Sequence, residues 1–166
     1  MKKILHLALF LGIVSCVAGG ALSFVNSITK PIIDANALKE VQATLEEFFP
    51  NGSFEEATIK GDVEYITNVY TVKEGGAVYK VSSQGFKDAI IFLVAIDADN
   101  NYIGYKVTQN NDTAGFGTRV SEAEFTDMFM DKSIDSQIDT LGGATYSSKA
   151  VKVGLDEVAA YHKANY

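Results

Sequence analysis

The segment 139–148 reads Asp139-Thr140-Leu141-Gly142-Gly143-Ala144-Thr145-Tyr146-Ser147-Ser148. After it, residues 149–166 have apolar residues at steps of four, three and four, which predict an amphipathic helix. Thr145, Ser147 and Ser148 are candidate N-caps of this helix. Residues without a Cβ atom allow close approach to the backbone, and the free N–H groups of a helix N-terminus favour a phosphate. The segment therefore predicts either a capped glycine turn or a phosphate site, in which the hydroxyl of Thr145 could carry the phosphate covalently.

The middle of the chain is rich in predicted strands. Gly75-Gly76 and the segment 97–101 are turn signals between them. The nearly continuous apolar run at 89–96 is the best candidate for a central strand. Alternating or continuous apolar residues predict strands at 63–72, 77–83, 89–96 and 102–108.

Two further helices are predicted around these strands. Apolar residues at helical spacing cover 34–49, and Pro50-Asn51-Gly52 ends that helix. Ser121-Glu122-Ala123-Glu124 is a capping box, so a helix is expected after it. Runs of strands with helices gathered elsewhere indicate an α+β fold, an antiparallel sheet flanked by helices.

The N-terminus predicts a membrane anchor. Residues 4–25 are apolar without a formal charge, and as a helix they would span about 33 Å, more than the hydrocarbon core of about 30 Å. Lys2 and Lys3 place the N-terminus in the cytoplasm and the rest of the chain outside. We expect a transmembrane anchor at 1–25, a juxtamembrane helix at 26–50 and an extracytoplasmic domain at 51–166. The alternatives are a cleaved signal peptide and a lipoprotein modified at Cys16.

Charge and composition exclude several classes of function. After residue 25 the chain carries 12 Lys and Arg against 21 Asp and Glu, a net charge of −9, which argues against binding nucleic acid or anionic lipid. The single cysteine, Cys16, lies in the apolar segment, so the soluble part has no disulfide or iron–sulfur ligands. His162 is the only histidine there and is expected at the surface. We expect no metal site and no catalytic activity of the chain alone.

Segment 139–148 resembles the flavinylation motif of the FMN-binding domain family, whose usual form is Asp-x-x-Ser-Gly-Ala-Thr-x-Thr-Ser. The family includes the G subunit of the Rnf electron-transport complex and the related C subunit of the Na⁺-translocating NADH:quinone reductase. In the family, the threonine after Gly-Ala forms a phosphoester with FMN, installed by a flavin transferase that consumes FAD. The resemblance implies covalent FMN at Thr145 and recognition of Asp139 by the transferase. Gly142 replaces the usual serine, and Ser147 replaces the second threonine.

A second segment, 112–117, is similar to the family's Glu-Thr-Pro-Gly-Leu-Gly, which lies against the flavin. Without reference to the family, segment 112–117 is interpreted as a polar loop before a helix. Gly85-Phe86 also resembles a Gly-Tyr-x-Gly turn of the family, although the aromatic residues of the strand region are interpreted as core residues. The resemblance implies cofactor contacts from Asp112, Thr113, Gly115, Phe116, Gly117, Gly142, Gly143, Ala144, Thr145, Tyr146, Ser147 and Ser148.

The resemblance covers nearly the whole chain and implies a membrane-anchored flavoprotein electron carrier. It would be the G subunit of an Rnf-type ferredoxin:NAD⁺ oxidoreductase that pumps Na⁺ or H⁺ across a bacterial cytoplasmic membrane. Its partners would be the other membrane subunits and, during maturation, the flavin transferase. Two alternatives stay open: a free-standing extracytoplasmic flavoprotein, and a flavin-free membrane-tethered accessory protein whose glycine turn is structural.

Overall fold

The computed structural model describes residues 2–166, apart from the side chains of 2–5, 7, 8, 28 and 30–38. The chain divides into two compact units, and the boundary between them along the sequence follows Ala43. The long helix α1 (Lys2–Phe48) includes the stretch Leu9–Ser27, which is long and apolar enough to cross a membrane and is exposed throughout. The anchor at 1–25 and the juxtamembrane segment at 26–50 both fall largely on this helix. The side chains of Lys2 and Lys3, on which the predicted orientation depends, lie outside the described part.

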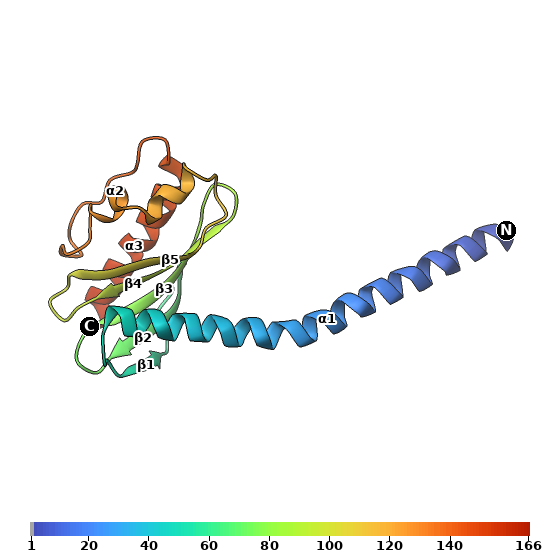
Figure 1. Cartoon of the computed structure of the whole chain (residues 1–166), viewed down its shortest axis with the longest axis horizontal. Coiled ribbons are helices and arrows are strands. Elements are labelled where there is room, and N and C mark those ends of the chain that lie inside the picture. Colours follow the sequence, from blue (N-terminus) through green and yellow to red (C-terminus); the bar gives the residue numbers. More distant parts are fainter. Residues whose placement is uncertain (1) are drawn as a thin grey trace. The chain divides into compact units, whose positions relative to one another are not determined.

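The second unit is built on a five-stranded antiparallel sheet in which the strands follow one another in chain order (Figure 1). This confirms the predicted α+β class. Four strands match the predicted segments, and the nearly continuous apolar strand β4 lies inside the sheet with a neighbour on each side. The strands are β1 (Phe54–Ala57), β2 (Ile66–Val72), β3 (Ala77–Gln84), β4 (Ala89–Ile96) and β5 (Tyr102–Gln109).

Strand β1 was not predicted. It is only four residues long, and its central residues Glu55 and Glu56 are exposed. It forms the edge of the sheet, where one partner strand, β2, provides all of its pairing. A short charged edge strand has no apolar alternation, so a sequence pattern could not show it.

One face of the sheet is covered by helix α3 (Thr145–Asn165), which begins four residues earlier than predicted. Val151, Leu155 and Val158 of α3 are fully buried in the main core. The helix approaches the sheet closely at Gly154, where an added Cβ would lie 2.7 Å from Cγ1 of Val81. This close approach fixes the distance between the middle of α3 and the sheet.

The other face receives the last turn of α1, residues 44–48. Leu45 is buried there, and Lys106 of β5 forms an ion pair of 2.8 Å with Glu47. The ring of Phe48 fills the space above Gly104, where an added Cβ would lie 2.4 Å from a ring carbon. The sheet is therefore covered on both faces, which explains why β4 is apolar along its whole length.

Two local predictions are wrong. The expected capping box does not form: α2 (Ala123–Thr126) is a single turn with Glu122 at its N-cap, and the Ser121 hydroxyl donates to Thr118 O at 3.1 Å. The preceding 3₁₀ helix η1 (Gly117–Ser121) already uses Ser121, so this residue is not available as the cap. His162 is not at the surface, because α3 packs it beside Tyr79 of β3, whose hydroxyl lies 2.7 Å from its Nδ1.

Candidate functional site

Helix α3 starts directly at the glycine turn of segment 139–148. Ala144 occupies the N-cap position and provides no side-chain cap, so the prediction of a cap at Thr145, Ser147 or Ser148 is wrong. These three residues already belong to the first turn of the helix. Ser148 instead ties the turn to the helix from the buried side: its hydroxyl donates to Ala144 O at 2.9 Å and accepts from Leu141 N–H at 3.0 Å.

The first turn of α3 presents free backbone donors. The N–H of Ala144 bonds Leu141 O at 3.1 Å, and the N–H of Ser148 bonds Ala144 O at 2.9 Å. Between these two, the N–H groups of Thr145, Tyr146 and Ser147 have no acceptor among the described residues. Three unsatisfied donors at the positive end of a 21-residue helix form a site that suits an anion.

Gly143 gives the turn its shape. Its φ of +79° lies in the left-handed region that favours glycine. Thr145 follows two residues later with an exposed side chain. Its hydroxyl lies 3.4 Å from Leu141 O, which is long for an O–H···O hydrogen bond. The hydroxyl is therefore accessible and only weakly engaged.

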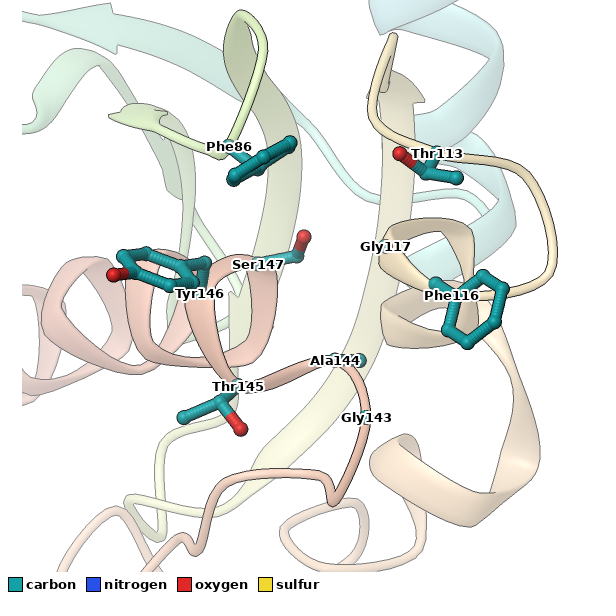
Figure 2. Close-up of a pocket in the computed structure, with 9 residues that line it drawn as sticks. All are labelled: Phe86, Thr113, Phe116, Gly117, Gly143, Ala144, Thr145, Tyr146 and Ser147. Atoms are coloured by element: carbon teal, nitrogen blue, oxygen red, sulfur yellow. The ribbon is translucent and has the colours of Figure 1, made fainter.

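An open pocket of about 210 Å³ lies in front of this helix start. Figure 2 shows Phe86 and Tyr146 on one side of it and Phe116 on the other. All three rings are more than half exposed, and the rings of Phe86 and Tyr146 lie 5.8 Å apart. Large exposed apolar rings around a pocket suit a planar aromatic ligand. The pocket is lined by Phe86, Thr113, Phe116, Gly117, Gly143, Ala144, Thr145, Tyr146 and Ser147.

Asp112 joins three segments that contribute lining residues to the pocket: the Phe86 turn, the 112–117 loop and the first turn of α3. Its buried carboxylate accepts hydrogen bonds from Phe86 N–H at 3.0 Å, Lys87 N–H at 2.7 Å and the Ser147 hydroxyl at 2.6 Å. Burial raises the pKa of Asp112, but these hydrogen bonds outweigh it, and the pKa stands below its ordinary value. The ionised carboxylate thus connects the Phe86 turn and the 112–117 loop to α3.

This junction is tightly packed. A Cβ added at Gly117 would lie 2.5 Å from Asp112 Cβ and 2.6 Å from Ser147 Oγ, and one added at Gly85 would lie 2.7 Å from Asp112 Oδ2. Glycine at these two positions is what allows the carboxylate to approach both segments. Asp112 therefore acts on a ligand through the residues that it holds.

The remaining predicted site residues lie around the pocket. Gly142 and Gly115 are exposed, next in sequence to the lining residues Gly143 and Phe116, and Ser148 is buried. Asp139 is exposed at the start of the glycine segment. None of these four lines the pocket, whereas eight of the predicted residues do.

Sequence reasoning missed two residues of this region. Phe86 was interpreted as part of the core, yet it is 62% exposed and lines the pocket. Arg119 was not singled out, although its guanidinium donates to Gly142 O at 2.9 Å. One signal could have indicated it: Arg119 is the only arginine in the chain. Within the described residues, no group of three or more His, Cys, Asp or Glu side chains could hold a metal ion.

Comparison with known proteins finds family matches for two segments of the chain. Residues 85–160 match the FMN-binding domain, and residues 1–48 match the RnfG N-terminal region. Every residue that lines the pocket falls within the first match.

Similar proteins cover most of the chain. The G subunit of the proton-translocating ferredoxin:NAD(+) oxidoreductase complex of Clostridium ljungdahlii is 27% identical, over 85% of this chain and 82% of its own. The G subunit of the Na(+)-translocating ferredoxin:NAD(+) oxidoreductase complex of Acetobacterium woodii is 27% identical, over 93% and 89%. The G subunit of the ion-translocating oxidoreductase complex of Methanosarcina acetivorans is 24% identical, over 96% and 95%.

Proposed function

Because this chain belongs to the FMN-binding domain family and begins with an RnfG N-terminal region, we propose that it is an FMN-binding electron carrier in a membrane-bound, ion-translocating oxidoreductase complex. The similar proteins support this role, since each is named as the G subunit of such a complex and aligns with both the helix and the domain. Two of them belong to ferredoxin:NAD(+) oxidoreductases, so ferredoxin and NAD⁺ are the donor and acceptor of the whole complex in this proposal.

The second part of the proposal is covalent attachment of FMN to Thr145. The observation that carries it is the exposed, weakly engaged Thr145 hydroxyl within a helix turn whose N–H groups are free. Attachment joins Thr145 Oγ1 to the FMN phosphorus and breaks the phosphoanhydride bond of FAD, with AMP as the leaving group and loss of the hydroxyl proton. The free N–H groups of Tyr146 and Ser147 would be available to hold the negatively charged phosphodiester.

The residues present fit a flavin. Phe86, Phe116 and Tyr146 offer exposed rings for the apolar part of the isoalloxazine, and the helix start offers donors for the phosphate. When bound, FMN supplies the redox chemistry, and the protein positions it. The pocket, at about 210 Å³, is smaller than the roughly 300–1,000 Å³ of typical ligand clefts and cavities, so a bound flavin would not be fully enclosed and part of its ring would stay accessible to redox partners.

The anchor and the maturation enzyme complete the proposal. The domain lies on the extracytoplasmic side, since Lys2 and Lys3 precede the apolar stretch. A flavin transferase installs the FMN there and recognises Asp139, which is exposed beside the glycine turn. The ion crosses other subunits, because Leu9–Ser27 contains no formally charged residue. The two relatives at 27% identity are named for different ions, so the similarity favours neither Na⁺ nor H⁺.

The test is coexpression of the full chain with an active flavin transferase. Wild type should gain the mass of one FMN less one water and fluoresce on a denaturing gel. Thr145→Val should lose both signals with unchanged circular dichroism, because Thr145 is not a cap and exposed substitutions usually change stability by less than about 0.5 kcal/mol. Thr145→Ser keeps a hydroxyl and should retain attachment in part. Thr140→Val, an exposed matched control in the same segment, should be flavinylated like wild type.

Three outcomes would each contradict a part of the proposal. Covalent flavin in Thr145→Val would exclude this residue as the acceptor. Wild type that stays flavin-free beside an active transferase would support the flavin-free accessory protein instead. A flavinylated chain that never copurifies with other membrane subunits would support the free-standing flavoprotein.

A further inference from the structure

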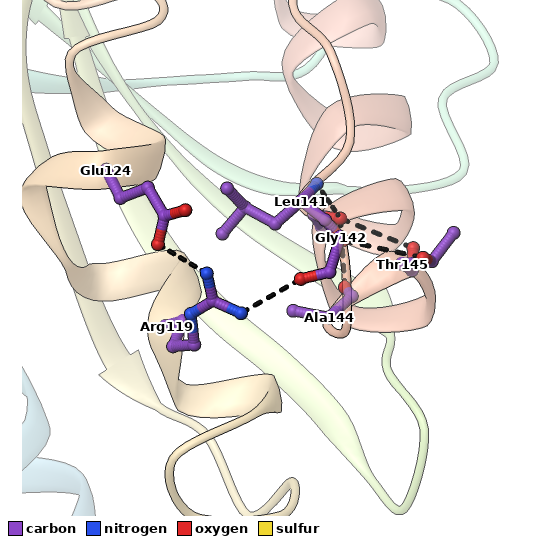
Figure 3. Close-up of polar contacts among 7 residues, drawn as sticks. Arg119, Glu124, Leu141, Gly142, Ala144 and Thr145 are labelled. Atoms are coloured by element: carbon purple, nitrogen blue, oxygen red, sulfur yellow. Dashed lines mark hydrogen bonds and ion pairs between the residues drawn. The ribbon is translucent and has the colours of Figure 1, made fainter.

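The only arginine in the chain lies against the proposed attachment turn. Arg119 comes from η1, and its Nη1 donates to Gly142 O at 2.9 Å while its Nη2 pairs with the carboxylate of Glu124 (Figure 3). Its side chain is about one quarter exposed, and that of Glu124 is 56% exposed. The guanidinium therefore stands at the surface next to the turn, between a carbonyl and a carboxylate.

The guanidinium also reaches the next residue of the turn. A Cβ added at Gly143 would lie 3.5 Å from Arg119 Nη1 and 4.0 Å from a ring carbon of Phe116. Gly143 lines the pocket and lies two residues before Thr145. The absence of a side chain at Gly143 leaves the space beside the guanidinium open toward the pocket.

An arginine beside this turn is better suited to bind a phosphate than a lysine would be. A guanidinium carries more N–H donors than its two contacts with Gly142 and Glu124 use, and it holds phosphate oxygens in a fixed planar geometry that an ammonium cannot reproduce. Of the 14 Lys and Arg residues of this chain, all except Arg119 are lysines. The donors of Arg119 that remain unused, together with the free N–H groups of α3, offer two kinds of phosphate contact at one turn.

We propose that Arg119 is the phosphate-positioning residue of this site. It fixes the glycine turn through Gly142 O and directs its remaining donors to the phosphate of the flavin that is joined to Thr145. Glu124 holds the guanidinium in place and competes with the phosphate for it. This inference rests on the proposed attachment of FMN, and it concerns recognition of the phosphate alone.

The test separates phosphate recognition from folding by comparing FMN with riboflavin, which lacks the phosphate. The full chain in detergent carries Thr145→Val, so that binding is non-covalent, and flavin fluorescence reports the two affinities. Adding Arg119→Gln should lower the affinity for FMN by at least about tenfold, equal to about 1.4 kcal/mol, and leave riboflavin unchanged. Adding Glu124→Gln should raise the FMN affinity by up to about fivefold.

A matched control and a covalent assay complete the design. Lys152→Gln removes the same charge from an ion pair with Asp156 further along α3 and should change neither affinity. With Thr145 intact and the transferase present, Arg119→Gln should be flavinylated at least about tenfold more slowly than wild type, whereas Glu124→Gln should not be slower. If the Thr145→Val chain binds neither FMN nor riboflavin, the flavinylation rate of Arg119→Gln becomes the deciding measurement.

Three results overturn the inference. Equal losses of FMN and riboflavin affinity in Arg119→Gln would show that the arginine only maintains the fold. FMN affinity that is unchanged in this variant would remove its role altogether. Flavinylation of Arg119→Gln at the wild-type rate would do the same. If wild type is flavinylated, each of these three results leaves the proposed function intact. If wild type does not acquire FMN, the proposed function itself is removed.

Discussion

Replacing Asp112 by asparagine tests whether one buried carboxylate holds the three parts of the pocket together. In the structure, Oδ2 accepts from Phe86 N–H and the Ser147 hydroxyl, and Oδ1 accepts from Lys87 N–H. Asparagine has one acceptor oxygen. If this oxygen replaces Oδ2, the NH₂ group faces the Lys87 N–H. In the opposite orientation the NH₂ group faces the Phe86 N–H, while the Ser147 hydroxyl can turn to accept from that NH₂ group. Either way a part-buried backbone N–H, of Lys87 or of Phe86, loses its acceptor.

The magnitude follows from these contacts. A hydrogen bond to a charged group contributes about 1.5–3 kcal/mol, and an unsatisfied buried donor costs about 1–3 kcal/mol. We therefore expect Asp112→Asn to lower the free energy of unfolding by about 2–4 kcal/mol at pH 7. In either orientation the connection between the Phe86–Lys87 turn and α3 is weakened, so non-covalent flavin affinity should fall as well.

The same contacts predict a pH dependence. The pKa of Asp112 is lower in the folded chain than the ordinary value of about 3.9 for an unfolded one. Its contribution to stability is therefore complete above that ordinary value and is lost as the pH falls through the folded pKa. Asparagine does not titrate, so the difference between wild type and Asp112→Asn should be largest at neutral pH and shrink below about pH 3.9.

Urea unfolding of the full chain in detergent, followed by near-UV circular dichroism of its tyrosines at pH 7 and pH 3, measures both effects. Asp139→Asn removes an exposed carboxylate nearby and should change stability by less than about 0.5 kcal/mol. A loss below about 0.5 kcal/mol in Asp112→Asn, or a loss that is the same at both pH values, would refute the argument that this carboxylate joins the pocket.

Two further predictions concern the rest of the chain. Gly104→Ala places a Cβ against the ring of Phe48 and should destabilise the domain by about 1–3 kcal/mol in the same urea assay. In a Phe48→Ala background, which is itself less stable than wild type, the same glycine substitution should cost less. An equal cost in both backgrounds would contradict a steric cause. Protease added to right-side-out vesicles should digest the domain after residue 50, and protection of the domain would overturn the extracytoplasmic placement.

The sheet was predictable because its signals are local. The segments at 77–83 and 89–96 show strand patterns without reference to any other part of the chain, and β3 and β4 form there. Strand β1 was not predictable, because Phe54–Ala57 becomes a strand only by pairing with β2. The same reason applies to His162, whose burial depends on contact with Tyr79, 83 residues away.

The sequence by itself determined the chemistry available at the glycine turn. Two glycines, a hydroxyl and a helix start lie within a few residues of each other, and their meaning depends only on local backbone geometry and on the resemblance of the motif. The exposed Thr145 hydroxyl and the free N–H groups beside it follow from this order of glycines, hydroxyl and helix start. The helix begins earlier than its apolar pattern indicates, so Ser147 and Ser148 lie in its first turn and are not caps.

Only the tertiary structure decided what surrounds that turn. The hydroxyl of Ser147 reaches Asp112 over 35 residues of sequence, and Arg119 reaches Gly142 over 23. The ring of Phe86 comes to the pocket because Asp112 accepts the Phe86 N–H. These contacts exist because α3 packs across the sheet and brings its first turn beside two loops. Such packing depends on the complementary shape of distant segments, which no local pattern encodes.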